Sequence, residues 1–253
     1  MRNRGMAKIF IDVGGHLGET VEAVIDPKYG FDVIYSFEPV SSCCERIRQI
    51  RDSRVRVMTV GLSNRDFEAS IHNPGSLGAS LYEDAPDAQG KSEKCRFIEA
   101  ARFFREHIKQ SDRVYLKLNC EGSEVDVIEN LIINDEWSKV TNAMIDFDAR
   151  KIPSQRLRVE SVTNLLVKTG MDNYQFPEDY MYGTGSHFGG IKNWLNKTGA
   201  IDFGIRSRLM SLIFHSKNVV GRKHLGFYKL KILRHTPVFL VNYYYNKMKR
   251  NVR

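Results

Sequence analysis

The residues most able to do chemistry near the start of the chain are a glycine-rich loop and a carboxylate that follows it. Gly14, Gly15 and Gly18 lie within residues 12–20, between a short apolar run and a segment with helical spacing. Small residues let the backbone approach a ligand there, and the first turn of a helix offers unpaired N–H groups. Glu38 ends the next apolar run, where a carboxylate can accept hydrogen bonds from a ribose diol. The pair predicts a ribose-bearing cofactor.

The loop departs from the dinucleotide fingerprint G-x-G-x-x-G. His16 occupies the position of its second glycine, which disfavours a pyrophosphate but leaves a nicotinamide-dependent oxidoreductase as an alternative. The opening Asp12-x-Gly14 instead looks like that of methyltransferases that use S-adenosylmethionine (SAM). SAM carries an ammonium and a sulfonium, so the carboxylates of Asp12, Glu19, Glu38 and Glu121 would be favourable at this rim.

Four sequence blocks follow one another in order: residues 12–18, residues 37–39, Ser63 and residues 117–124. They resemble the FkbM family of SAM-dependent methyltransferases, whose pattern is D-x-G-x-x-x-G, then F-E-P, then a Ser after the third strand, then K-x-D-x-E-G-x-E. The resemblance covers about residues 8–147. It implies transfer of a methyl group to a hydroxyl oxygen, often on a sugar. We therefore expect an O-methyltransferase that acts on a sugar or glycoconjugate of the surface-polysaccharide type, and the alternative is a catalytically silent SAM-binding module.

The resemblance also implies roles for individual residues. Asp12 and the loop glycines would hold the methionine side, Glu38 the ribose, and Ser63 the region of the adenine. Asn119 and Glu121 would face the methionine end or the acceptor. The expected cofactor contacts are Asp12, Gly14, Gly15, His16, Gly18, Glu19, Thr20, Glu38, Pro39, Ser63, Asn119 and Glu121. Asn119 stands where the family has Asp, so the acceptor oxygen is kept and the charge is lost.

Methyl transfer to a hydroxyl also needs a group that takes the proton. Asp146 and Asp148 end the fifth expected strand and, by strand alternation, point the same way. They could equally cap the next turn or pair with the basic residues that follow. His16 is a further candidate base, or a loop side chain bonded to backbone, and His187 lies in a glycine-rich segment that could close over an acceptor. The histidine spacing predicts no metal site.

These residues need a scaffold that brings strand ends together. Apolar runs separated by helical spacing predict a Rossmann-like, doubly wound, mostly parallel sheet over about residues 7–190, as in class I SAM methyltransferases. The expected strands cover residues 8–13, 32–37, 54–60, 113–118 and 142–147, with a short strand at 67–72 and an edge strand at 174–176. The expected helices cover residues 18–25, 44–51, 99–107, 123–131 and 159–168. Residues 73–80 are expected as a glycine-rich loop, 83–94 as an exposed polar segment and 182–190 as a flexible one.

The charge is distributed unevenly along the 253 residues. Residues 203–253 contain 12 Lys and Arg and no acidic residue, so the remaining 202 residues have 26 basic and 30 acidic side chains and a net charge of −4. We expect a SAM-dependent methyltransferase domain at 1–202 and a basic, aromatic-rich extension at 203–253. The extension could contact an anionic membrane surface, pack on the body, or join a homo-oligomer, and a nucleic-acid role is disfavoured.

The expected location of the protein rests on the absence of three sequence patterns: a membrane-spanning stretch, a signal peptide and paired cysteines. No apolar stretch reaches the roughly 18 residues of a membrane-spanning helix, and the N-terminus does not have the pattern of a signal peptide. The four cysteines form no CxxC pair. These features predict a cytoplasmic protein with reduced thiols, peripheral to the inner membrane leaflet if the basic extension binds lipid.

Overall fold

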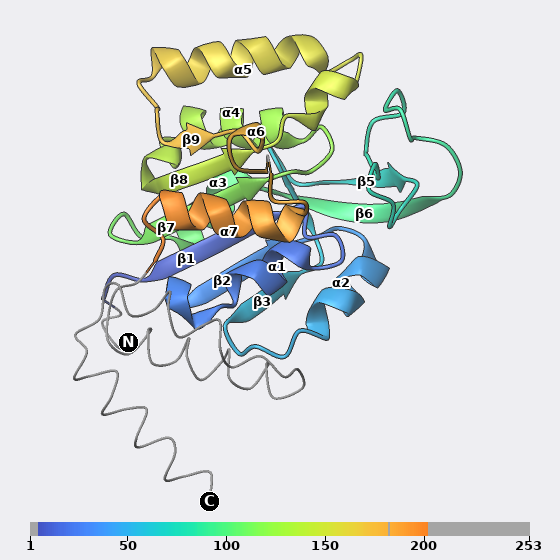
Figure 1. Cartoon of the computed structure of the whole chain (residues 1–253). Coiled ribbons are helices and arrows are strands. Elements are labelled where there is room, and N and C mark those ends of the chain that lie inside the picture. Colours follow the sequence, from blue (N-terminus) through green and yellow to red (C-terminus); the bar gives the residue numbers. More distant parts are fainter. Residues whose placement is uncertain (1–4, 182, 202–253) are drawn as a thin grey trace, which may run out of the picture.

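A six-stranded sheet in which all neighbouring strands are parallel forms the centre of the computed structural model, which describes residues 5–181 and 183–201 (Figure 1). Its order is β3-β2-β1-β7-β8-β9, so the chain winds outward from β1 and returns to start again at β7. The strands are β1 (Lys8–Val13), β2 (Val33–Phe37), β3 (Val55–Met58), β7 (Arg113–Leu118), β8 (Val140–Ile145) and β9 (Tyr174–Gln175). This confirms the Rossmann-like fold and places the point where the winding reverses between β1 and β7.

Helices cover both faces of this sheet. Helices α1 (Glu19–Val24) and α7 (His187–Lys197) share an apolar cluster with one face, and α3 (Ala100–His107), α4 (Glu124–Ile133) and α5 (Arg156–Lys168) share one with the other. Every residue of β1 is buried, as expected for a central parallel strand. Helix α2 (Ser41–Arg48) packs beside β3, and α6 (Glu178–Met181) beside α7. Short 3₁₀ helices cover Pro27–Tyr29, Trp137–Lys139 and Asp148–Lys151.

A second, three-stranded sheet of order β4-β6-β5 is inserted between β3 and α3 and projects to one side of the molecule (Figure 1). It consists of β4 (Gly61–Ser63), β5 (Phe67–His72) and β6 (Ser92–Glu99). Its apolar side chains cluster with Val40 and Cys43 at the start of α2. The small sheet therefore faces the carboxyl end of β2, where Glu38 lies.

The structure corrects several of the expected boundaries. Residues 92–94 of the expected polar segment belong to β6, because they pair with β5, while Ser92 and Lys94 are exposed as expected. Strand β8 covers Val140–Ile145 instead of 142–147, and helix α5 begins at Arg156 instead of at residue 159. Helix α2 begins at Ser41, three residues before the expected start. The segment expected to be flexible contains the start of α7, where the Ser186 side chain accepts a hydrogen bond from the Gly189 N–H and so caps the helix.

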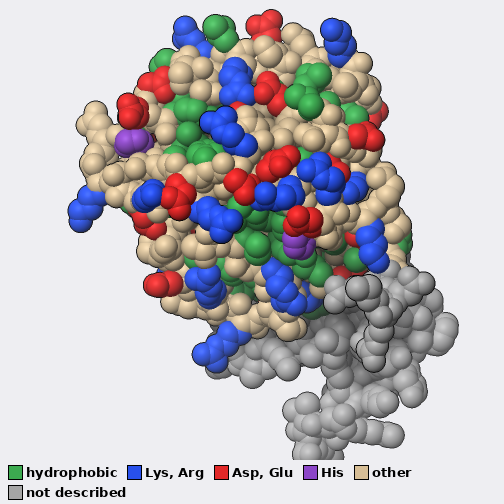
Figure 2. All heavy atoms as spheres, turned by 180° about the vertical axis from the view of Figure 1, so that it is seen from behind, with side chains coloured by type: hydrophobic (Ala, Val, Ile, Leu, Met, Phe, Trp, Pro, Cys, Tyr) green, Lys and Arg blue, Asp and Glu red, His purple; other side chains and the backbone are tan. Residues whose placement is uncertain are grey.

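The surface of the described part gives little sign of the basic character of the whole chain. Figure 2 shows one face, on which Lys and Arg side chains alternate with Asp and Glu and form no patch of one sign. The basic extension expected at 203–253 lies outside the described residues, and so its membrane and oligomer roles remain predictions. Among residues 5–181 and 183–201, no helix is long and apolar enough to span a bilayer.

Candidate functional site

The glycine loop between β1 and α1 folds tightly against the ends of β2 and β7. The N–H groups of Gly14 and Gly15 both donate to the carbonyl of Phe37, at 3.0 and 3.1 Å. Gly14 has φ +84°, and a Cβ atom there would lie 1.8 Å from the backbone oxygen of Asn119. Only glycine fits this position, because any side chain would collide with the backbone of the neighbouring strand end.

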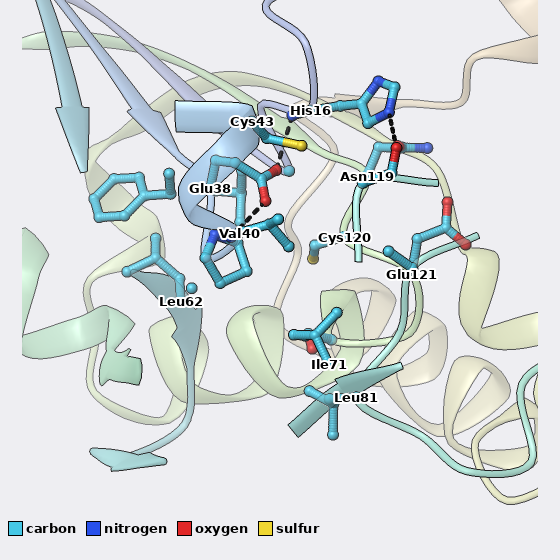
Figure 3. A pocket seen from close by; sticks show the side chains of 18 of the residues that line it. His16, Glu38, Val40, Cys43, Leu62, Ile71, Leu81, Asn119, Cys120 and Glu121 are labelled. Carbon is cyan, nitrogen blue, oxygen red and sulfur yellow. Dashed lines mark hydrogen bonds between the residues drawn. The ribbon is translucent and has the colours of Figure 1, made fainter. Parts of the chain in front are cut away.

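Glu38 ties the loop to the end of β2. Its side chain is nearly buried, and its two oxygens accept the N–H groups of His16 and Val40, both at 2.8 Å (Figure 3). Burial raises the pKa of Glu38 above its ordinary value, and the two backbone donors oppose that shift. Because a carboxylate has about four lone-pair sites, two donors leave it able to accept hydrogen bonds from a diol.

Asp12 does not lie at the rim of the site. It is fully buried beneath the loop, where its Oδ1 lies 3.1 Å from Lys117 Nζ and its Oδ2 accepts the Ser36 hydroxyl at 3.3 Å. The Lys117 ammonium also donates to the carbonyl of Gly14 at 2.8 Å. Burial raises the pKa of Asp12, and the charge of Lys117 opposes that shift. The pair supports the loop from below, so direct contact of Asp12 with a ligand, as the resemblance implied, is not what this geometry favours.

A cleft opens between the glycine loop, the end of β2 and the small sheet. It encloses about 720 Å³ of space not filled by protein, part of it open to solvent. One side is polar, with Glu38, His16, Asn119 and Glu121. The other is apolar and includes Val40, Leu62, Ile71 and Leu81 (Figure 3). Phe37, Leu77 and Phe97 also line the cleft. The cleft thus suits a ligand with one flat apolar part and one hydroxyl-rich part.

The cleft gathers half of the expected cofactor residues. Those that line it are Gly14, His16, Glu38, Pro39, Asn119 and Glu121. Asp12, Gly15, Gly18, Glu19, Thr20 and Ser63 are not among the lining residues. Ser63 is buried, and the cleft is instead lined at that strand by Gly61 and Leu62. These two residues, rather than Ser63, form the wall in the region expected for an adenine.

Asn119 lines the cleft and contacts Asp146 and Asp148, which are not among the lining residues. The two aspartates follow β8 instead of ending it, because the strand stops at Ile145 and Asp148 begins a 3₁₀ helix, so strand alternation does not set their directions. The Asn119 Nδ2 donates to Asp146 Oδ2 at 3.0 Å and to Asp148 Oδ2 at 3.2 Å. The other oxygen of Asp148 pairs with Lys151. An Asp at position 119 would add a third carboxylate between the first two, whereas the amide supplies the two hydrogens that hold them together. Asn at position 119, where the family pattern has Asp, therefore fits the two carboxylates beside it.

The two aspartates differ in exposure. The side chain of Asp148 is 3% exposed and that of Asp146 is 31% exposed. Asp146 Oδ1 lies 3.8 Å from Arg150, a loose contact. Burial and the neighbouring charge of Asp148 raise the pKa of Asp146. The expected pairing with basic residues is thus present at both positions, but only Asp146 keeps an accessible oxygen.

The acidic residues of the loop after β7 have a related environment. Burial, followed by the charge of Asp148, raises the pKa of Glu121, which has φ +51° and lines the cleft. Burial also raises the pKa of Glu124 to about 7, although its carboxylate accepts the N–H groups of Cys120 and Gly122. Glu124 thereby closes the turn into α4, and an acidic side chain is favourable at the start of a helix.

The two histidines have their ring nitrogens engaged. His16 Nε2 lies 3.3 Å from the carbonyl of Gly75, and its Nδ1 lies 3.6 Å from Glu19. His187 Nε2 lies 3.0 Å from the Thr20 hydroxyl, and burial lowers the pKa of His187 to about 4. His16 therefore bridges two loops, and His187 contacts the start of α1, while its role over an acceptor stays a prediction.

The wall formed by the small sheet was not expected from the sequence. Ile71, Leu81 and Phe97 line the cleft together with Gly75, Ser76, Leu77 and Ala79 of the glycine-rich loop. The available signals were the alternation of apolar residues in 67–71 and the two serines of the loop. The two serines, Ser76 and Ser80, allow either a contact with cofactor or acceptor or a solvated loop, and of these Ser76 lines the cleft. Neither signal indicated that strands β5 and β6 would form a wall of the cleft.

Comparisons with known proteins add one match of modest strength. No family model and no curated protein matches the chain. A solved crystal structure described as methyltransferase FkbM from Methylobacillus flagellatus KT is similar at 16% identity and a TM-score of 0.42. The match covers 66% of this chain and 38% of that chain, so that the chain spans less than half the length of that protein. Its description names the family that the sequence motifs resemble.

Proposed function

We propose that the chain is a SAM-dependent methyltransferase that transfers a methyl group to a hydroxyl oxygen of a sugar or glycoconjugate. The observation that carries the proposal is Glu38, a nearly buried carboxylate that faces the glycine loop across the mouth of the cleft. It stands at the end of the second strand of the sheet, where a ribose diol is commonly held in folds of this type.

The residues present fit the parts of SAM. The apolar wall of Val40, Leu62 and Ile71 suits an adenine, and Glu38 keeps lone pairs for the ribose. Gly14 lines the cleft at the glycine loop, where the methionine side of SAM would lie. When bound, SAM supplies a methyl group that is already activated by its sulfonium. The protein then has to orient the acceptor, exclude water and take up one proton.

Asp146 is the residue best placed to take that proton. Its accessible carboxylate is fixed by Asn119, which itself lines the cleft. Asp148 is almost fully buried, and both of its oxygens are engaged by Asn119 and Lys151, so it acts as a positioning residue. His16 has both ring nitrogens turned to other groups and is the weaker candidate.

A polyhydroxylated acceptor suits the same edge of the site. Asn119, Glu121 and Asp146 all carry side-chain oxygens that can accept hydrogen bonds from hydroxyl groups. Their burial is partial, so an acceptor can reach them from solvent. A glycolipid-linked sugar remains compatible with the proposal, and the basic residues 203–253 would then hold the protein at an anionic membrane surface.

Replacing Glu38 by Ala should weaken the binding of S-adenosylhomocysteine, the demethylated product of SAM. We expect the dissociation constant to rise by a factor equivalent to about 1–3 kcal/mol, because the ribose hydroxyls lose a buried acceptor. Isothermal titration calorimetry measures this change. Glu45→Ala is the matched control, since Glu45 is an exposed acid on the neighbouring helix α2.

Two results would contradict the proposal at different levels. Equal affinity of Glu38→Ala and Glu45→Ala for S-adenosylhomocysteine would refute the assigned ribose contact. Tight binding without any transfer of tritium from methyl-labelled SAM to a panel of methyl glycosides would instead favour the catalytically silent module.

A further inference from the structure

The glycine-rich loop at residues 73–80 crosses the cleft and is fixed at both of its ends. At its base, His72 and Ser80 exchange backbone hydrogen bonds of 2.8 and 3.3 Å. On one side, the carbonyl of Gly75 meets His16 Nε2 at 3.3 Å. On the other, the Ser80 hydroxyl donates to the carbonyl of Glu121 at 2.7 Å. The loop therefore spans from the glycine loop to the turn after β7.

Ser76 lies in the middle of this loop and is unusual in its hydrogen bonding. Its backbone N–H donates to the carbonyl of Asn73, and its own carbonyl accepts from Ala79, so the local turn satisfies its main chain. Its hydroxyl oxygen is buried and has no hydrogen-bond partner within the described residues. Ser76 also lines the cleft. A buried hydroxyl without a partner is uncommon in native proteins, and a bound water or ligand would supply the hydrogen bond.

We propose that the Ser76 hydroxyl recognises the nucleoside part of the bound cofactor, an assignment that rests on the proposed function. Ile71, Ala79 and Leu81, which line the cleft together with Ser76, belong to one apolar cluster. A zwitterionic amino-acid end would lose its hydration there without charged partners, whereas a purine would keep its faces in apolar contact and its edge nitrogens on a hydroxyl. Loop 73–80 is thus the nucleobase-binding arm of the site.

Ser76→Ala tests the assignment with two ligands that share the nucleoside. S-adenosylhomocysteine contains the amino-acid end, and 5′-methylthioadenosine lacks it. We expect the affinity for both to fall by the same factor, roughly 2- to 12-fold, which is the usual range for one hydrogen bond. Ser70→Ala is the matched control, because Ser70 is an exposed serine on β5 of the same small sheet.

The stability of the free protein supplies a readout that a structural role would not produce. Removing a buried hydroxyl without a partner should leave the free energy of unfolding unchanged or raise it, while the ligand affinity falls. A structural serine would instead lower the stability of the free protein when it is replaced. Chemical denaturation without ligand, beside the two titrations, separates these cases.

Three outcomes would overturn the assignment. Unchanged affinity of Ser76→Ala for both ligands would show that the hydroxyl does not contact the nucleoside. A loss seen with S-adenosylhomocysteine alone would move Ser76 to the amino-acid end. Failure of the unaltered protein to bind either ligand would remove the proposed function as well, which distinguishes that failure from the first two.

Discussion

Replacing Asp146 by Asn is expected to lower the rate constant for methyl transfer by about 10²- to 10⁴-fold, the usual contribution of a general base. The change is nearly isosteric, and the new side-chain oxygen can still accept the hydrogen bond from Asn119. The affinity for S-adenosylhomocysteine should therefore stay within about twofold. Single-turnover assays with tritiated SAM, together with calorimetry, measure the two quantities separately.

The pH dependence of the methyl-transfer rate gives a second, independent test of Asp146 as the base. Burial and the charge of Asp148 raise the pKa of Asp146, while Lys151 and the Asn119 amide lower it and Glu178 raises it. A base must be deprotonated, so the rate falls as the pH falls through this raised pKa. The acidic limb should consequently lie above the value of about 3.9 of an ordinary aspartate.

Two controls make the result specific to Asp146. Asp172→Asn removes an exposed carboxylate outside the network and should leave the rate and its acidic limb unchanged. Asp148→Asn should lower the rate less than Asp146→Asn, because Asp148 acts through the position of Asn119. Full activity of Asp146→Asn, or an unchanged acidic limb in that variant, would exclude Asp146 as the base.

Replacing Lys117 by Met should destabilise the protein by about 3–5 kcal/mol, the range found when one partner of a buried ion pair is removed. Asp12 would then be fully buried without its counter-charge, and the carbonyl of Gly14 would lose its donor. The loss should shrink as the pH falls, because a protonated Asp12 needs no counter-charge. Urea denaturation between pH 5 and pH 8 measures both effects.

The double variant Asp12→Asn/Lys117→Met provides the control for charge. It removes both charges and should recover a large part of the lost free energy of unfolding, since no buried ion remains unpaired. Equal destabilisation of the single and double variants would show that Lys117 acts through packing and not through Asp12.

The central strands could be predicted because they are buried on both faces. Residues 8–13 and 113–118 are apolar runs whose expected limits coincide with β1 and β7. Helix α7 was missed because Gly189 and Gly190 lower helix propensity in its first turn. Its apolar residues Ile191, Trp194 and Leu195 have helical spacing and could have indicated it.

The small sheet was harder to predict because its pairing is not local. The three residues of β4 pair with β6, whose own first residues are polar and largely exposed. A three-residue strand has no periodicity to detect, and only the fold brings it beside a partner more than 30 residues away. The wall of the cleft opposite Glu38 therefore could not be predicted from a local sequence pattern.

In the candidate site, too, local sequence spacing predicted some features, and contacts between distant residues determined the others. The spacing of the glycines and Glu38 predicted which strand ends would meet, and Gly14 and Glu38 do line one cleft. The burial of Asp12 could not be predicted, because its partner Lys117 becomes adjacent only when β1 and β7 pair in register. The role of the Asn119 amide likewise depends on two carboxylates that follow the next strand, β8.

Calorimetric titration of the full chain with S-adenosylhomocysteine, beside a parallel titration with NAD⁺, tests the central claim most directly. The account predicts saturable binding of S-adenosylhomocysteine at one site per chain and no binding of NAD⁺ at the same concentrations. Absence of heat with S-adenosylhomocysteine, or tighter binding of NAD⁺, would contradict the claim that this cleft holds the adenosine of SAM.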